Sequence, residues 1–386
     1  MFLPETVEKL RQIAEGIVEA TIRPQAQNVD QSCEWPQHTI EALSHAGLMG
    51  LHVEARLGGH GQGLLALAAV NEELSKGCAS SAMCFGMHCI ASAVIAAKAT
   101  HYHEEKYLRP IAAGKHITTL ALSEPGTGAH FYIPETRLIR DAEHYRIHGT
   151  KHFVTNGKHA HSYVISTVAA NESLASTGDF SCILLDSNAP GLQWQEPWRG
   201  MGMRGNSAAT LQISAARAPL SNLLGAEGDQ TWFIFEIVAP YFLVAMASTY
   251  LGISQAALDI VVEHVTGRKY THSGETLSEI PAVQSHVAEM WIQVARTRQL
   301  LYHAAMLGDS GEASAIVHLC AAKVEASSTA TRVTDQALSL CGGSAYKENG
   351  VLSRLIRDAR ASHVMAPTTD MLNLWIGRGL LKLPVL

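Results

Sequence analysis

The spacing of apolar residues changes twice along this chain of 386 residues, and the two changes divide it into three parts. Up to residue 116, apolar residues recur every three or four positions, as on one face of a helix. Over 117–222 the spacing falls to two, with frequent turn residues, which indicates short strands. The helical spacing then returns and continues to the end. We therefore predict an α+β multidomain chain: an N-terminal all-α domain (1–116), a middle β-domain (117–222) and a C-terminal helical domain (223–386).

The same patterns predict the individual elements. Helices are expected over 7–18, 35–46, 64–76, 80–99, 104–113, 230–266, 280–307, 312–340, 351–363 and 368–380. Strands are expected over 117–122, 145–148, 152–155, 163–168, 181–185 and 209–213.

Composition excludes several classes of function. Hydrophobic residues make up 47% of the chain and charged residues 17%, which suits a chain that buries much of its surface. A net charge of −6 gives no basic field for nucleic acid. The seven cysteines form no C-x-x-C pair, which favours buried thiols in a reducing compartment, and we expect no metal site. Charges near the N-terminus argue against a signal peptide, so we expect a cytoplasmic protein.

One uncharged stretch, 237–258, is long enough to span a bilayer. It contains Pro240, two tyrosines and several hydroxyl side chains, a polar load that is unusual for a lone span facing lipid. We therefore expect a buried bundle helix and no membrane contact.

Two short motifs carry the chemical information. Residues 120–129 read LALSEPGTGA, and residues 149–157 read GTKHFVTNG. The first strand should end at Pro125, which cannot donate to a ladder. Gly126 and Gly128 then allow the backbone to approach a ligand closely.

These motifs resemble the acyl-CoA dehydrogenase family, whose consensus runs roughly A-L-[ST]-E-P-x-A-G-S-D and then G-x-K-x-W-I-T-N-G. The segment 201–207 (MGMRGNS) resembles a further turn of the family. The resemblance covers the whole chain. It implies an N-terminal helical domain, a β-barrel-like middle domain and a C-terminal four-helix bundle.

The resemblance implies bound FAD. Ser123 would hydrogen-bond the isoalloxazine, Thr155 would lie at its N5 edge, and Phe153 replaces the usual tryptophan. Arg268 and the pair Gly342 and Gly343 would reach the FAD of a neighbouring subunit, which implies a homodimer or homotetramer. The complete predicted cofactor set is Leu122, Ser123, Gly128, Ala129, Phe153, Val154, Thr155, Arg268, Gln284, Gly342, Gly343 and Thr368.

The family pattern fails at the catalytic base. Most members use the glutamate of R-D-A-x-x-x-x-I-Y-E-G-T, whereas residues 357–368 here read RDARASHVMAPT. Ala366 replaces the glutamate, and Pro367 removes the following N–H. The alternative base position of some relatives is Phe242. The nearby carboxylates of Asp370 and Glu236 are candidates for a relocated base, followed by the histidines at 88, 130 and 363.

Three functions remain open at this stage. The first is α,β-dehydrogenation of an acyl thioester, carried on CoA or on an acyl carrier protein, with electrons passing to an electron-accepting flavoprotein or to oxygen. The second is a flavin-dependent oxidase or monooxygenase on the same fold, for which no α-proton base is needed. The third is a non-catalytic flavin-binding or thioester-binding subunit.

Overall fold

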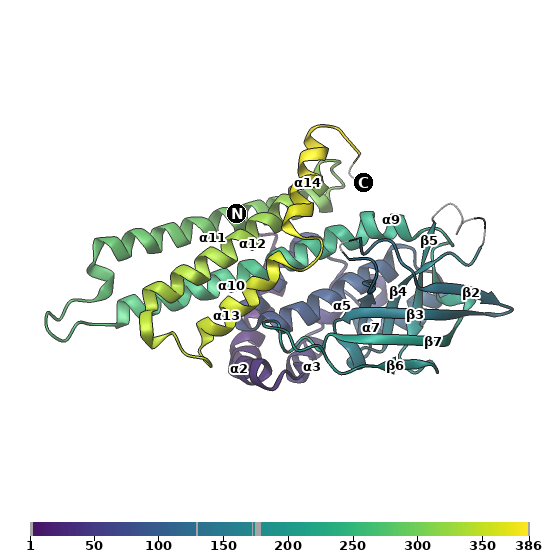
Figure 1. Cartoon of the computed structure of the whole chain (residues 1–386), viewed down its shortest axis with the longest axis horizontal. Helices are drawn as coiled ribbons and strands as arrows, with labels where there is room; N and C mark the ends of the chain where they lie inside the picture. The colour runs from purple at the N-terminus through teal and green to yellow at the C-terminus, as the bar shows by residue number, and fades with distance from the viewer. Residues whose placement is uncertain (1–2, 129, 172, 174–178, 385–386) are drawn as a thin grey trace.

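A computed structural model describes residues 3–384 of the chain apart from 129, 172 and 174–178. A sheet lies at one end of the elongated molecule and a bundle of long helices at the other (Figure 1). The order helical, β, helical agrees with the sequence prediction of the fold class.

The N-terminal helices surround two buried ones. They are α1 (Glu5–Ile17), α2 (Arg23–Ser32), α3 (Gln37–His45), α4 (Leu64–Gly77), α5 (Ala79–Ala97), α6 (His101–His103) and α7 (Arg109–Ala112). Nearly every residue of α4 and α5 is buried. Because α5 is apolar on nearly all sides, its sequence predicts burial without indicating which face meets which neighbour, whereas α4 also buries the polar side chains of Asn71, Glu72 and Glu73.

The middle domain is an eight-stranded sheet in the order β6-β7-β3-β2-β4-β5-β8, with β1 paired parallel to β4. Its strands are β1 (Thr118–Ala121), β2 (Arg137–Asp141), β3 (His144–Val154), β4 (Ser162–Val168), β5 (Phe180–Asp186), β6 (Leu192–Trp194), β7 (Ala209–Pro219) and β8 (Leu223–Leu224). The strands predicted over 145–148 and 152–155 are one bent strand, β3. Its pairing with β7 shifts register between Ile147 and Gly149 and again between Lys151 and Val154. These irregularities interrupt the alternating pattern, which is why the sequence suggested two strands.

Three strands, β2, β6 and β8, were not predicted. The strand β2 is largely exposed, with only Leu138 fully buried, and the other two have three residues or fewer. Such segments carry too little apolar alternation to be recognised.

The C-terminal domain is built on α10 (Ala239–Gly267), α11 (Pro281–Asp309), α12 (Ala315–Cys341), α13 (Val351–Arg360) and α14 (Thr369–Leu380). A short helix, α9 (Gln230–Trp232), and a π-helical segment, Phe233–Val238, lead into α10. The helix α10 packs against α12 and also against α4 and α5, so it joins the two helical domains. Gly252 permits the contact with α4, since a Cβ there would lie 2.4 Å from the carbonyl oxygen of Glu72.

Two of the described helical segments, Ala79–Ala97 and Gln230–Gly267, are long and apolar enough to cross a membrane. Their most apolar windows are 94% and 67% buried inside the fold. Packing against other helices therefore accounts for their apolar character, as predicted for 237–258.

Candidate functional site

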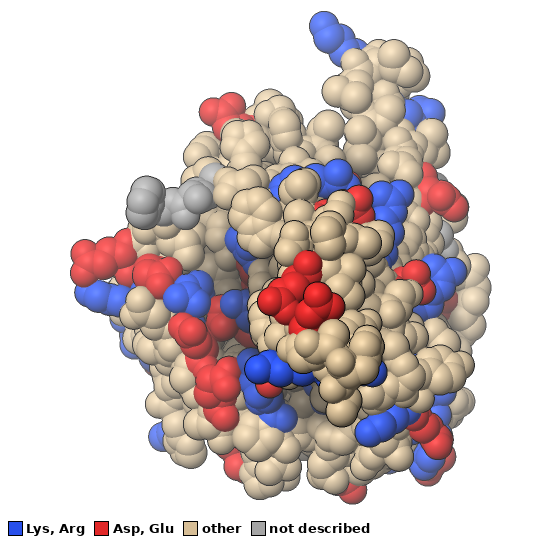
Figure 2. Space-filling model, turned by 90° about the vertical axis from the view of Figure 1, so that its left-hand side faces the viewer, with Lys and Arg blue, Asp and Glu red and all other residues tan. Residues whose placement is uncertain are grey.

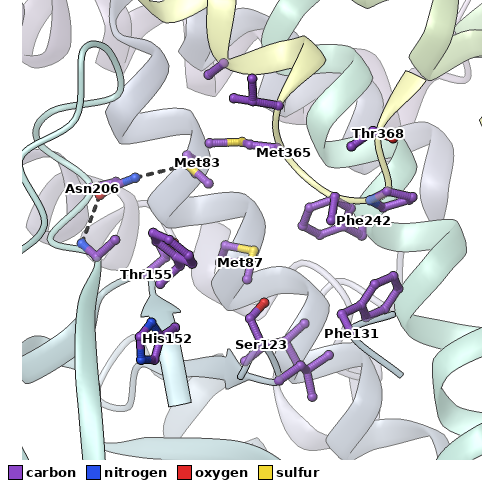
Figure 3. Close-up of a pocket in the computed structure, with 18 of the residues that line it drawn as sticks. Met83, Met87, Ser123, Phe131, His152, Thr155, Asn206, Phe242, Met365 and Thr368 are labelled. Carbon is purple, nitrogen blue, oxygen red and sulfur yellow. Dashed lines mark hydrogen bonds between the residues drawn. The ribbon is translucent and has the colours of Figure 1, made fainter. Parts of the chain in front are cut away.

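A cavity of about 750 Å³ opens where the sheet meets the helices. Ser123 and Thr155 approach it from the sheet side, and Phe242, Met365 and Thr368 from the helical side, with Met83 and Met87 on α5 between them (Figure 3). The described lining consists of Met83, Met87, Leu120, Leu122–Pro125, Gly128, Phe131, His152, Phe153, Thr155, Trp198, Met201, Gly202, Asn206, Ala208, Val238, Ala239, Phe242, Leu243, Arg357, Arg360, Ala361 and Val364–Thr368. The cavity thus combines segments from all three domains.

A buried ion pair shapes the sheet wall. The Lys151 ammonium is fully buried and lies 2.5 Å from a carboxylate oxygen of Glu124. It also donates to the carbonyl oxygens of Leu122 and Ser166, at 3.3 and 2.7 Å. Burial raises the pKa of Glu124, but the charge and hydrogen bond of Lys151 outweigh it, so the carboxylate pKa is lowered. These contacts hold the corner after β1 that presents Ser123 to the cavity.

The end of β3 presents an aromatic ring and a hydroxyl. Phe153 adopts a positive φ of 54°, and the residue is 57% exposed. It meets Trp198 edge to face, with 5.8 Å between the ring centroids. Val154 is fully buried and is not among the described residues that line the cavity, whereas Thr155 is one of them. This end is fixed because the Asn156 amide donates to the carbonyl of Cys84 at 2.9 Å.

The turn over 201–207 is held against α13. The Asp358 carboxylate accepts a hydrogen bond of 2.6 Å from the Met203 amide. A Cβ at Gly202 would lie 2.3 Å from the carbonyl oxygen of Arg357, so glycine allows this close contact. The Arg357 guanidinium forms an ion pair with Asp30 and donates to the Met201 carbonyl.

Apart from Arg357, Arg360 and Thr368, the helical wall is formed by hydrocarbon and thioether side chains. Val238 ends the π-helical segment before α10, Ala239, Phe242 and Leu243 come from the start of α10, and residues 364–367 come from the loop between α13 and α14. The Ala366–Pro367 peptide bond is cis. Both positions from which the family's glutamate would act are therefore apolar in this cavity.

The titratable side chains of the described lining are Glu124, His152, Arg357 and Arg360. Glu124 and Arg357 are engaged in ion pairs, and an arginine cannot accept a proton at neutral pH. His152 is the one remaining side chain of this set that can take up a proton. It lies on the sheet side of the cavity, near Ser123 and Thr155 (Figure 3).

The carboxylates proposed from the sequence as relocated bases lie elsewhere. Asp370 and Glu236 are exposed, and neither belongs to the described lining. The three candidate histidines also lie outside it. His88 is buried between the Met49 carbonyl and the Thr118 amide, and burial lowers its pKa to about 4. His130 pairs with the Tyr132 hydroxyl, and burial lowers the pKa of His363.

The predicted cofactor residues fall into two groups. Leu122, Ser123, Gly128, Phe153, Thr155 and Thr368 line the cavity. Arg268, Gln284, Gly342 and Gly343 belong to the far end of the helical bundle, at the end of α10, the start of α11 and the end of α12 (Figure 1). This end carries acidic and basic side chains side by side (Figure 2). Ala129 lies outside the described residues.

Several lining residues were not singled out from the sequence. Met83 and Met87 are four residues apart on α5, but that helix is apolar all round, so no sequence signal shows which face meets a cavity. Asn206 lies in the turn that resembled the family. Its amide contacts the Met83 sulfur at 3.4 Å and accepts from the Ala208 amide at 2.9 Å.

Helical, β and helical domains around one mostly apolar cavity define a class of flavin-dependent oxidoreductases, and comparison with known proteins identifies the family. Models of the N-terminal, middle and C-terminal domains of acyl-CoA dehydrogenase match residues 4–115, 119–216 and 244–381. The chain belongs to the acyl-CoA dehydrogenase family. Members of this family use FAD and oxidise CH–CH bonds, which confirms the predicted cofactor and enzyme class.

Individual relatives match over nearly their whole length. Cyclohex-1-ene-1-carbonyl-CoA dehydrogenase of Geobacter metallireducens is 33% identical, over 93% of this chain and 94% of the relative. The mitochondrial short-chain specific acyl-CoA dehydrogenase of Sus scrofa is 31% identical, over 98% and 91%. Among solved structures, butyryl-CoA dehydrogenase of Megasphaera elsdenii has a TM-score of 0.92 at 25% identity and covers 99% of each chain.

The cavity suits an isoalloxazine ring. Its sheet wall offers the Ser123 and Thr155 hydroxyls, and the exposed rings of Phe153 and Trp198 offer π faces beside them. A Cβ at Gly128 would meet nothing within 4 Å among the described atoms, so the backbone there is open to a ligand. The residues present therefore fit the cofactor that the family uses.

Proposed function

We propose that this chain oxidises an acyl thioester by α,β-dehydrogenation, and that the α-proton passes to water or to His152 instead of to a carboxylate. The observation that supports the proposal is that two walls of different chemical character face each other across one cavity. The sheet wall has the residues for flavin, and the opposite wall is apolar enough to hold an acyl group. We further propose that an electron-transferring flavoprotein accepts the electrons.

The side chains that line the cavity have different roles in this proposal. Ser123 and Thr155 would hold the FAD isoalloxazine, which would supply an acceptor for the hydride that leaves the β-carbon. Phe242, Leu243 and Met365 exclude water from the acyl chain and hold it in van der Waals contact. No uncommitted carboxylate in the described lining can remove the α-proton.

The missing carboxylate predicts a substrate preference. A positioned general base typically contributes 10²- to 10⁴-fold to a rate. Without that contribution, thioesters whose α-proton is already acidified and whose β-carbon is saturated, for example those with an α-aryl substituent, should react faster than simple saturated ones. We propose such activated acyl thioesters as the substrate class, on CoA or on a carrier protein.

The test is an anaerobic titration of the FAD-loaded protein with simple saturated and α-aryl-substituted thioesters of CoA and pantetheine, following the loss of flavin absorbance. Bleaching by an activated thioester is the expected result. A flavin that no member of the panel bleaches would overturn the proposal. In a His152→Gln variant, slower bleaching would assign the proton to His152, and an unchanged rate would assign it to water.

Apolar residues at both base positions also favour a second candidate, an oxygen-dependent oxidase or monooxygenase. Such chemistry needs no α-proton acceptor, because reduced flavin reacts directly with oxygen. Its test is to reduce the flavin externally and to follow product formation in air with a panel of amines and sulfur heterocycles. A protein inactive in both tests that retains FAD would indicate a binding subunit.

A further inference from the structure

A buried lysine stands directly behind the loop that forms the helical wall. Lys323 belongs to the middle of α12 and has no exposed surface. Its ammonium donates to the carbonyl oxygen of Ser362 at 2.7 Å and to that of Pro367 at 3.1 Å. One side chain thus binds both ends of the segment 362–367.

This lysine is costly to bury. Within the described residues its hydrogen-bond acceptors are backbone carbonyls and not a carboxylate, and burial lowers its pKa to about 8. A leucine or methionine would fill the same space without that cost, but would leave both carbonyl oxygens without this donor. The contacts to the loop therefore give the reason for an ammonium at this position.

The segment between the two bonds is cavity wall. Val364, Met365, Ala366 and Pro367 line the cavity, and Thr368 both lines it and caps α14 by accepting from the Met371 amide at 3.4 Å. The other side-chain contacts of the loop are longer than 3.2 Å: for example, the Ser327 hydroxyl donates to the Ser362 carbonyl at 3.3 Å, and Tyr250 to the Met365 sulfur at 3.3 Å. The ammonium makes the shortest of these contacts.

We infer that Lys323 is a positioning residue: it fixes the 362–367 loop, and with it the wall that sets how close an acyl group lies to the flavin. The inference about the loop stands on geometry alone. Its consequence for the acyl group rests on the proposed function.

Hydrogen exchange in the FAD-loaded full-length protein tests the positioning directly. The amides of Val364 and Met365 are protected because both donate to the Ala361 carbonyl, at 3.1 and 3.0 Å. In Lys323→Met we expect these amides to exchange at least about tenfold faster, while the other amides of α12 keep their protection. For Lys323→Gln, which retains a neutral donor, we expect exchange rates at these amides between those of the wild type and those of Lys323→Met.

Thr334→Ala is the matched control, since this buried hydroxyl of α12 bonds only to carbonyls of its own helix. Its loop exchange should equal that of the wild type. Unchanged exchange at Val364 and Met365 in Lys323→Met would overturn the inference, and so would an equal increase along all of α12, which would mean general destabilisation.

Thioester titration separates this inference from the proposed function. If thioesters bleach the wild-type flavin, Lys323→Met should need about tenfold more thioester for half-maximal bleaching. If no thioester bleaches the wild type, the proposed function fails, and the exchange measurement still decides whether Lys323 positions the loop.

Discussion

By the family resemblance of the sequence, Ala366 and Phe242 occupy the two positions from which a glutamate would act beside the acyl group. Both line the same cavity here, so neither position supplies a carboxylate to it. We therefore expect the change to affect proton removal, because the residues that suit the flavin still line the cavity.

Restoring the carboxylate should restore the missing step. Ala366→Glu is expected to accelerate flavin bleaching by saturated acyl-CoA, by 10²-fold or more on the general scale of base catalysis. Stopped-flow absorbance under anaerobic conditions measures the rate. Ala366→Gln is the control, since it has the same size and no base. Equal rates for the two variants would show that the cavity does not place an acyl group at this position.

The Lys151 and Glu124 pair should matter for stability, because each charge is buried. Lys151→Met leaves the Glu124 carboxylate without its partner and is expected to lower the free energy of unfolding by about 3–5 kcal/mol. Urea denaturation measures the loss. The double variant Lys151→Met with Glu124→Gln should recover part of it, and a double variant as unstable as the single one would refute this account.

At the scale of elements, α13 holds the 201–207 turn beside the cavity, and one of its contacts to the turn is the buried carboxylate of Asp358. Burial raises the pKa of Asp358 from 3.8 to about 6, against the opposing effects of the Met203 amide and of Arg354. Between these two pH values the folded chain keeps a proton that the unfolded chain has released. The contribution of Asp358 to stability therefore falls as the pH rises from about 4 to 6 and stays low above that range.

Asp358→Asn removes this pH dependence and keeps an oxygen that can accept from the Met203 amide. Between pH 4 and pH 7, the unfolding free energy of the wild type should fall by up to about 3 kcal/mol relative to that of Asp358→Asn. Urea denaturation across that range provides the measurement, with the exposed Asp335→Asn as control. Parallel curves for wild type and Asp358→Asn would contradict the prediction.

At the scale of the whole molecule, the predicted cofactor residues lie at two separate ends. Arg268 is exposed at the far end of the bundle and does not belong to the described lining of its own cavity. The family resemblance predicts that it serves the cavity of a second copy. One chain would then hold two half-sites.

Mixed oligomers test this arrangement. Arg268→Gln should weaken FAD retention, and Ser123→Trp should block the cavity, so each protein alone should bind little FAD. Co-expressed chains with separate tags should recover part of the FAD, because a mixed pair contains one site free of both substitutions. Flavin absorbance after tandem affinity purification gives the result, and no recovery would place Arg268 outside the site.

The sequence predicted the fold well because apolar spacing is a local property, and the two period changes separate helical parts from the sheet. The prediction was weakest where a tertiary contact overrides local pattern. The bent strand β3 was divided in two at its irregular pairing with β7, and the exposed strand β2 had no apolar alternation to reveal it.

The sequence alone determined the α, β, α order, the flavin motifs and the absence of the family's glutamate, because each of these can be read from residues close together in the chain. Only the tertiary structure decided which side chains share the cavity. It placed Asp370 and Glu236 at the surface, brought Met83 and Met87 to the lining, and set Lys323 behind a loop about forty residues further on. Such neighbours depend on how helices pack, and helices that are apolar on every side do not encode that choice in local spacing.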